Sequence, residues 1–393
     1  MAKFRQAAVE LFERGIVEQG SSLVEKWAHM LDAKGQPEVS NAYERYALSR
    51  VLETSNKVLS TEAASIATTT VFGTSYVKTM LGMTRQIWPR AFGLQLVSVQ
   101  PMDRPTGKIF HLKVTRDDLS TLGIRPQDSA ASQDYSQYIA SKTYADHTAG
   151  EGGEIAKGMS LAITDSDVSV TGSKKLKVSA TWELATDLAA YHNLNAMDIL
   201  QGAAVDEIAQ ELDARIVYSV RQAAIAHGTV TFGTAPAAEV WTNGSWSKRL
   251  QRAILNAEKL IFKASLRQPN IMVCGIDAMT ELRDLAAFTP VVTPDFEVSG
   301  YGVIPTGSLG VQYQVYMSRA VPDDEILIGR RGSGFLDAGI VYAPYVGLFI
   351  TDRFFDVNTQ KTIQSFAQRD EIVTVANTLY ARVRLDENAV GIS

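Results

Sequence analysis

The chain has 393 residues, of which 46% are hydrophobic and 21% charged, with a formal net charge of −5. This composition is typical of one large or two ordinary globular domains; it excludes wholesale disorder and argues against a dedicated nucleic-acid binder, which usually carries a basic stripe. No apolar run reaches the roughly 18–20 residues of a membrane span, and the single cysteine excludes an intrachain disulfide or a thiolate zinc cluster.

The first 60 residues have apolar side chains at helical spacing, interrupted at Gly35-Gln-Pro37, and predict a helical arm. Three large aromatic side chains in this arm have no obvious local core, and we expect them to be buried against a neighbouring subunit, as anchors of an interface, or against the underside of their own subunit. They are Trp27, Tyr43 and Tyr46. One alternative is a self-contained helical pair held by Phe12, Leu23 and Leu31. Another is a temporary arm that acts only during assembly.

Two strands are predicted at 108–114 and 176–184, the second because Leu176, Val178, Ala180, Trp182 and Leu184 alternate with polar residues. The segment between them is rich in Ser, Asp, Gly and Thr and lacks a core of its own. A coreless segment of this length is usually functional, so we expect a projecting two-stranded ribbon that gains order on another subunit. Its aromatic residues are further interface candidates: Tyr135, Tyr138 and Tyr144.

The longest helix is predicted to begin after Asn195, a suitable N-cap, and to end before Gly228. Apolar residues recur every four positions along it and form one stripe, with polar residues such as Glu211, Asp213 and Arg221 between them. We expect a structural core made of this stripe together with the preceding strand. Its members are Leu200, Ile208, Leu212 and Trp182.

The remainder of the chain predicts a small α/β layer followed by strands. A helix at 247–264, an apolar strand at 270–275 that contains Cys274, and a helix at 276–287 come first. Glycine-punctuated strands follow over 288–345, and 348–357, 364–369 and 372–377 predict a strand meander that packs against the long helix. The neighbours of Cys274 indicate a buried thiol rather than a nucleophile.

No compact polar constellation suggests catalysis, a cofactor or a metal. The five histidines, which lack ligand spacing, are His29, His111, His147, His192 and His227. Gly300-Tyr-Gly302 and Arg331-Gly-Ser-Gly334 lack the spacing of phosphate loops and are typical of turns. Asp323-Asp324-Glu325 suits a solvated turn, and Lys174, Lys175 and Lys177 suit a solvated strand face better than a phosphate site. We therefore expect no catalytic, cofactor or metal residues.

Three segments, in this order, resemble one family. Val99-Gln-Pro-Met-Asp-Arg-Pro-Thr-Gly-Lys-Ile-Phe110, the stretch 176–196, and Tyr342-Ala-Pro-Tyr-Val-Gly-Leu-Phe-Ile350 are similar to the major capsid proteins of tailed bacteriophages, in their T-even-like branch. The resemblance implies an α+β protein with the Hong Kong 97-type capsid fold. It also implies a division of the chain into a helical N-terminal arm (1–90), a peripheral-domain strand (91–107), an extended loop (108–184), a peripheral domain with its spine helix (185–240), an axial domain (241–345) and peripheral return strands (346–393).

The function implied by the resemblance is self-assembly. Hexamers and pentamers of the chain would form an icosahedral shell around double-stranded DNA, in the virion, after assembly in the host bacterial cytoplasm. Portal, scaffold and decoration proteins are the implied partners, with no membrane and no sequence-specific DNA contact. The chain is shorter than T-even proteins, so we expect their inserted domain to be reduced or missing. Two alternatives stay open: an encapsulin-type cellular shell, and an oligomeric α/β enzyme with a site between subunits.

Overall fold

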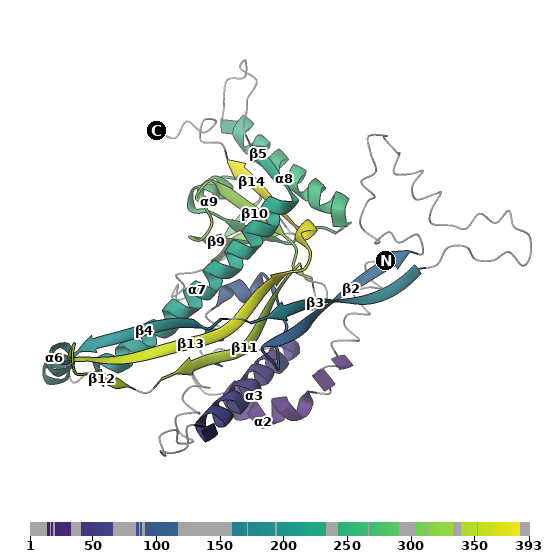
Figure 1. Cartoon of the computed structure of the whole chain (residues 1–393). Coiled ribbons are helices and arrows are strands. Elements are labelled where there is room, and N and C mark those ends of the chain that lie inside the picture. The colour runs from purple at the N-terminus through teal and green to yellow at the C-terminus, as the bar shows by residue number, and fades with distance from the viewer. Residues whose placement is uncertain are drawn as a thin grey trace, which may run out of the picture.

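The structure is a computed structural model of the chain, and it has an α+β architecture in which one long helix crosses two sheets (Figure 1). It describes residues 20–32, 41–65, 91–116, 159–170, 172–192, 195–232, 243–265, 267–290, 303–310, 313–332, 339–351 and 353–385, with isolated positions between 14 and 18 and between 84 and 88.

Helix α7 (Ala196–His227) is the spine of the molecule and confirms the prediction from its caps. The Asn195 side chain accepts a hydrogen bond from the Met197 backbone N–H, and the Gly228 N–H bonds back to the Ala224 carbonyl. Both termini therefore have partners for backbone groups that a helix leaves unpaired. Leu212 and Ile208 are buried on its apolar side, and Leu200 is half-buried.

The first half of α7 covers a long five-stranded sheet. In this sheet β13 is central: β4 lies along one side of it, and β11 and β12 follow one another along the other, with β1 beyond β11. Phe366 of β13 is fully buried against Ile208 of α7, together with Leu348 and Ile350 of β11. The strands are β1 (Ser98–Val99), β4 (Lys174–Thr181), β11 (Ile340–Ile350), β12 (Phe354–Asp356) and β13 (Lys361–Thr374).

The second half of α7 covers one face of a seven-stranded sheet, and α8 (Asn243–Ser265) and α9 (Ile276–Arg283) cover the other face. The strand order is β5-β14-β10-β6-β9-β8-β7. Its strands are β5 (Thr229–Phe232), β6 (Ile271–Cys274), β7 (Phe288–Pro290), β8 (Val303–Leu309), β9 (Tyr313–Ser318), β10 (Glu325–Gly329) and β14 (Tyr380–Leu385). The helix–strand–helix layer expected from the sequence is present.

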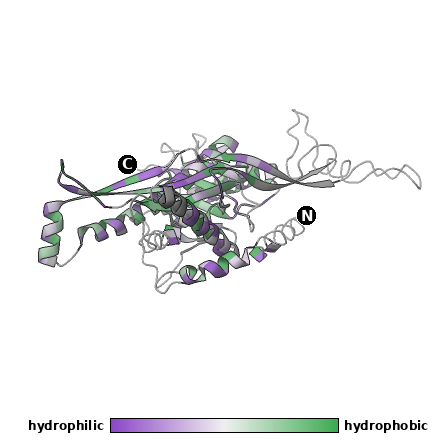
Figure 2. Ribbon diagram, turned by 60° about the horizontal axis from the view of Figure 1, so that its bottom comes forward, coloured by the Kyte–Doolittle hydropathy of each residue, from purple (hydrophilic) through white to green (hydrophobic). Residues whose placement is uncertain are grey.

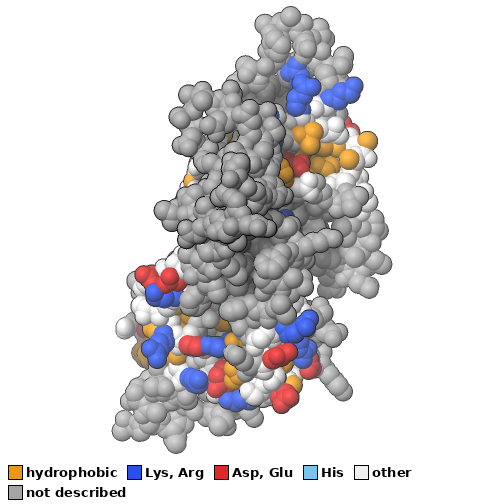
Figure 3. All heavy atoms as spheres, turned by 90° about the vertical axis from the view of Figure 1, so that its right-hand side faces the viewer, with side chains coloured by type: hydrophobic (Ala, Val, Ile, Leu, Met, Phe, Trp, Pro, Cys, Tyr) orange, Lys and Arg blue, Asp and Glu red, His pale blue; other side chains and the backbone are white. Residues whose placement is uncertain are grey.

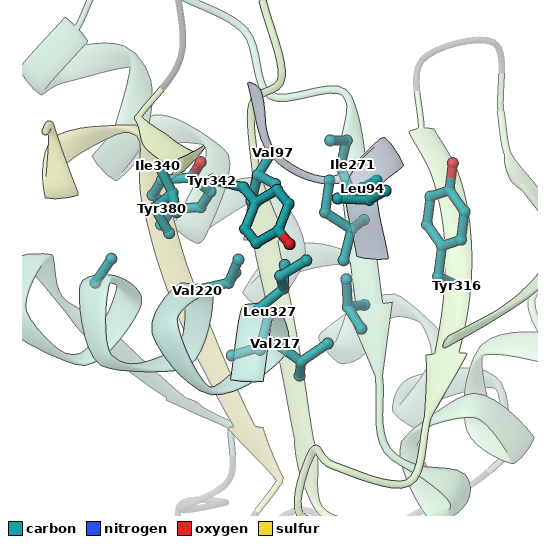
Figure 4. Packing of buried hydrophobic residues seen from close by; sticks show 14 of the residues in the cluster. Leu94, Val97, Val217, Val220, Ile271, Tyr316, Leu327, Ile340, Tyr342 and Tyr380 are labelled. Carbon is teal, nitrogen blue, oxygen red and sulfur yellow. The ribbon is translucent and has the colours of Figure 1, made fainter. Parts of the chain in front are cut away.

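One core joins the two sheets to the spine. Figure 4 shows Val217 and Val220 of α7 facing Leu327 of β10 and Tyr342 of β11, one residue from each sheet. The short helices η1 (Phe92–Gln95) and η2 (Asn377–Leu379) close this core through Leu94 and Leu379. At its centre, Val217, Leu327 and Tyr342 are each at most 2% exposed.

The N-terminal aromatic residues are packed within their own chain, which is the second of the two surfaces expected for them. Helix α2 (Ser21–Leu31) pairs with α3 (Ala42–Ser65), and Trp27 is 6% exposed. Tyr46 is buried, and the half-buried Tyr43 donates from its hydroxyl to the Val99 carbonyl at 2.8 Å. Trp27 packs among Leu31, Leu48 and Leu52. The arrangement therefore agrees with the alternative of a helical pair. Of the three residues named for that pair, Phe12 lies outside the described residues.

Three further expectations about strands are corrected. The partner of β2 (Thr106–Arg116) is β3 (Met159–Ser169), whereas β4, expected to be the returning strand of the ribbon, pairs with β13 in the long sheet. The predicted strand 176–184 stops at Thr181, because a helix begins at Trp182. The C-terminal segment does not stay with the long sheet, since β14 crosses into the seven-stranded sheet between β5 and β10.

Candidate assembly surfaces

The far end of the long sheet carries a short helix, α6 (Trp182–His192), which Figure 2 shows standing away from the body. The Thr181 hydroxyl accepts from the Leu184 N–H at 3.3 Å and caps the first turn. The Trp182 N–H donates to the Gln360 carbonyl at 3.2 Å, which ties the helix start to the turn between β12 and β13. These two hydrogen bonds explain why the alternating strand pattern ends here.

Large apolar side chains gather on α6 and on the neighbouring β12 turn. Trp182 is 61% exposed and Tyr191 81% exposed on α6, and Phe354 is 67% exposed on β12. Trp182 was expected in the core, and its exposure corrects that expectation. We name this group the tip patch; it consists of Trp182, Leu184, Tyr191, Phe354, Phe355 and Val357.

Charged residues of both signs surround the tip patch. Arg353 forms an ion pair with Asp198 at the start of α7, and Lys361 lies beside Thr181 in the strand register. Exposed acidic residues Glu183 and Asp187 lie on α6 itself. The charged residues around the tip patch therefore give it no strong excess of positive or negative charge.

A second projecting feature is the ribbon formed by β2 and β3, which pair over 11 residues in each strand. Its root is anchored: Ile109 and Val168 are buried against Val341 and Ala343 of β11. Lys108 is paired with Asp165 across the ribbon. Beyond this root the ribbon extends away from the body at the end opposite α6 (Figure 1).

A cavity of about 400 Å³ lies where the ribbon root meets α3. Two of its basic side chains have acidic partners, since Arg50 pairs with Asp103 and Lys108 with Asp165. These two residues therefore do not provide a free positive charge for an anion. The walls of the cavity include Tyr43, Tyr46, Arg50, Met102, Asp103 and Lys108.

Two buried carboxylates fasten α7 to the two sheets. Asp370 of β13, which is fully buried, accepts from Arg215 of α7 at 2.6 Å and from Lys174 of β4 at 3.0 Å. Lys174 is thus only partly exposed, in contrast to the solvated face expected for it, whereas its neighbours Lys175 and Lys177 are exposed. A buried carboxylate with two cationic partners is a strong orienting contact between elements.

Glu325, at the start of β10, makes the corresponding contact with the seven-stranded sheet. It accepts two hydrogen bonds from Arg221 of α7, at 2.7 and 2.9 Å, and one from Arg382 of β14 at 2.8 Å. Burial alone would raise the pKa of Glu325, but the hydrogen bonds from Arg221 and the charge of Arg382 bring it below its ordinary value of 4.5. Glu325 is 3% exposed, which corrects the expectation of a solvated turn.

A third buried carboxylate lies on α7 itself. Asp213, expected at a polar position between the apolar residues, is 2% exposed and accepts from the Gly93 N–H at 2.7 Å. The contact fixes η1 against α7. Sequence periodicity could not reveal it, because the donor is 120 residues away.

The described residues offer little for catalysis. Burial raises the pKa of the Cys274 thiol, which therefore stays neutral and unreactive. No group of three or more His, Cys, Asp or Glu side chains among the described residues could hold a metal ion. Within the same residues, no helix is long and apolar enough to cross a membrane. His227 Nδ1 lies 2.8 Å from the Tyr380 carbonyl and has a structural role.

Of the predicted interface residues that the structure describes, Tyr43 and Tyr46 lie together, with ring centroids 6.2 Å apart, whereas Trp27 packs separately between α2 and α3. Trp27, Tyr43 and Tyr46 lie in or beside the chain's own cores, while Tyr135, Tyr138 and Tyr144 lie outside the described residues, as do His147 and Gly300-Tyr-Gly302. The exposed aromatic residues of the tip patch were missed. A signal for them was present, because Phe354-Phe355 precedes the polar turn Asn358-Thr-Gln-Lys361, a position that favours exposure.

Comparisons with known proteins agree with one another. A profile of the family described as Major capsid protein Gp23 matches residues 74–154 and 124–390. The major capsid protein of Vibrio phage KVP40 is 22% identical, with 83% of this chain and 88% of that protein covered. That of Enterobacteria phage T4 is 21% identical, with 84% and 86% covered.

Solved structures with similar chains include one from Microbacterium phage Oxtober96, with a TM-score of 0.44 at 12% identity over 75% of this chain and 91% of that chain. Another is the holo-SrpI encapsulin complex from Synechococcus elongatus, with a TM-score of 0.43 at 10% identity over 83% and 94%.

Proposed function

The chain belongs to the major capsid protein Gp23 family, and from this premise we propose that hexamers and pentamers of it build an icosahedral shell around double-stranded phage DNA. A major capsid protein of a tailed phage is a structural component of the virion and not an enzyme. The family match favours the phage capsid over the encapsulin and enzyme alternatives.

The observation that carries the proposed assembly is the ribbon. Beyond a root held by Ile109 and Val168, β2 and β3 continue as two paired strands away from the body. A two-stranded hairpin is marginally stable alone in water, so a neighbouring subunit is the surface that would stabilise it. A contact that joins one end of a subunit to a different surface of the next repeats around a ring and closes by symmetry.

Each contact in such a shell can be weak, because every subunit makes several at once.

A mildly acidic wall also suits packaged DNA, because strong attraction between the wall and the phosphates would hinder movement of the DNA during filling. In the view onto the ribbon end, Figure 3 shows Lys and Arg interspersed with Asp and Glu on the lower part of the molecule, where α2 and α3 lie. The described charges of that region are of both signs, so they provide no basic stripe for tight binding of DNA. Portal, scaffold and decoration proteins are the proposed partners, and the host bacterial cytoplasm is the proposed place of assembly.

The test is the particle formed by the purified full chain. We expect electron microscopy to show shells or capsomer-sized rings, and sedimentation to show a mass far above that of a tetramer. A stable dimer or tetramer would contradict the proposal and favour the enzyme alternative. Deleting Asp128–Gly150 should leave a soluble, helical protein that forms no shells, while the exposed substitution Glu211→Ala serves as the control. Normal particles from the deletion variant would show that assembly does not depend on the ribbon.

A further inference from the structure

We propose that the outer face of α8 binds an acidic, amphipathic helix of another protein. The proposed shell does not require such a surface, so the inference goes beyond the proposed function. Helix α8 is a basic segment of an acidic chain: it contains five Lys or Arg residues and one Glu, whereas the whole chain has a net charge of −5. A local concentration of positive charge attracts a partner of opposite sign.

One side of α8 holds the helix on the seven-stranded sheet, where it lies beside β5 and β14 (Figure 1). Leu250, Ile254 and Ile261 are buried on this side in one core with Val383 of β14. The opposite side is exposed. We name its charged and large apolar residues the α8 face; they are Lys248, Arg252, Leu255, Lys259, Phe262 and Lys263.

The apolar and basic residues of the α8 face form two adjoining lines. Leu255 lies three residues after Arg252 and four before Lys259. Phe262 lies three residues after Lys259, and side chains at these separations are neighbours on a helix surface. Leu255 and Phe262 are 60% and 45% exposed and lie one above the other, about two turns apart. At about 1.5 Å per residue the whole face is about 22 Å long.

The cations of the α8 face have no carboxylate partner among the residues that the structure describes. All four are exposed: Lys248, Arg252, Lys259 and Lys263. The one acidic residue of α8, Glu258, is half-buried and accepts a hydrogen bond from the Tyr313 hydroxyl at 3.3 Å. The positive charge of the face is therefore available to a partner.

An amphipathic helix with acidic residues beside its apolar line matches both lines of the α8 face. Its carboxylates would pair with the cations, and its apolar side chains would cover Leu255 and Phe262. Duplex DNA matches only one line, because its phosphates would meet the cations and leave the two apolar side chains against a charged backbone. A protein helix is therefore favoured over nucleic acid.

A second copy of this chain is a poorer match. One of its exposed acidic helices is α6, which has 11 residues and is about 16 Å long. Glu183 and Asp187 are its acidic residues, against four cations on a face of about 22 Å. On α7, the exposed Glu207 and Glu211 lie next to exposed alanines, which offer little apolar area. The charge and length of the α8 face therefore fit a longer acidic helix from another protein.

A synthetic peptide tests the face. The probe carries a fluorophore and has leucines along one helix face with glutamates beside them. Fluorescence anisotropy measures its binding to unassembled full-length subunits. We expect Arg252→Glu together with Lys259→Glu to weaken binding at least tenfold, and Leu255→Ser at least threefold. The matched control, Lys175→Glu together with Lys177→Glu, makes the same change of charge at exposed positions of β4 and should alter binding less than twofold.

A second peptide of the same composition, with its leucines spread around the helix, should bind at least tenfold more weakly. Equal binding of the two peptides would overturn the proposal, and so would equal effects of the α8 and β4 variants. Unchanged affinity of Leu255→Ser would also overturn it. Tighter binding of a short duplex DNA than of the first peptide would overturn it by assigning the face to nucleic acid. Circular dichroism should be the same for all variants.

Sedimentation of the same variants distinguishes a contact between copies. If the double substitution on α8 changes self-association and the first peptide binds no better than the second, the face contacts another copy and the proposal is overturned. Peptide binding by subunits that form no shells would contradict the proposed function alone. Shells built from subunits that do not bind the peptide would contradict this inference alone.

Discussion

Helices α6 and α7 follow one another in the sequence and differ in what surrounds them. Helix α7 carries charged residues at many positions and yet is packed along its length against two sheets, where Arg215 and Arg221 meet the buried Asp370 and Glu325. Helix α6 is mostly apolar and yet is largely exposed. Composition alone therefore does not decide burial within one chain. The difference separates side chains that are buried within the subunit from side chains that are exposed on it, and the predictions below test that separation.

The largest expected loss of subunit stability comes from Trp27→Ala. Trp27 is 6% exposed among Leu31, Leu48 and Leu52, and its Nε1 donates to Glu53 at 3.1 Å. Removing a buried tryptophan side chain costs about 3–5 kcal/mol. Urea unfolding of the unassembled subunit measures this. Trp27→Phe, which keeps an aromatic ring, should recover much of the loss, and a loss below 1 kcal/mol for Trp27→Ala would return this residue to the list of interface candidates.

Next comes Leu212→Ala on the buried side of α7. Leu212 is 2% exposed in the core that joins both sheets, and a buried leucine truncated to alanine costs about 2–5 kcal/mol. Its neighbour Glu211 is exposed, so Glu211→Ala is the matched control and should change stability by less than about 0.5 kcal/mol. Equal losses would mean that the buried face of the spine is assigned wrongly.

A smaller effect is expected from Glu325→Gln, and it should depend on pH. The folded-state pKa of Glu325 is lowered, so its contribution is present above the ordinary value of 4.5 and is lost as pH falls through the lower folded value. The variant should lose about 2 kcal/mol at pH 7 and less at pH 3, since charge-assisted hydrogen bonds are worth about 1.5–3 kcal/mol.

Unfolding midpoints of both proteins at the two pH values measure this difference. A loss that is the same at both values would contradict the charged contact between α7 and β10.

The sequence predicted local features of the fold well. The limits of α7 were recognisable because Asn195 and Gly228 act through hydrogen bonds to residues within four positions. The helix–strand–helix layer around Cys274 was recognisable for a similar reason, since its apolar periodicity changes over a short stretch. The overall α+β architecture was predicted from the three segments that resemble the capsid family.

Contacts between distant residues could not be predicted in this way. Arg215 and Asp370 are 155 residues apart, and Arg221 and Glu325 are 104 apart, so no spacing rule connects them. The strand predicted over 176–184 is three residues longer than β4, because the alternation of apolar and polar residues continues through Leu184. The hydrogen bond that fixes the start of the helix goes from the Trp182 N–H to the carbonyl of Gln360, which is too distant in the sequence for any local pattern to reveal. Burial of Trp27 depends on Leu48 and Leu52 of the next helix, and the sequence had left that pairing open.

The smallest expected effect on the subunit comes from Trp182→Ala, and it completes the comparison with Trp27. Both substitutions delete the same side chain, but Trp182 is 61% exposed, so most of its surface is already in water in the single chain. Its backbone hydrogen bond to Gln360 remains, because it is made by the N–H group. Alanine also favours the helix that begins at this residue. Urea unfolding of the unassembled subunit should therefore change by less than about 1 kcal/mol, against about 3–5 kcal/mol for Trp27→Ala. A large loss of stability in the single subunit would show that Trp182 belongs to the core of its own chain, as its alternation with Val178 and Ala180 first suggested.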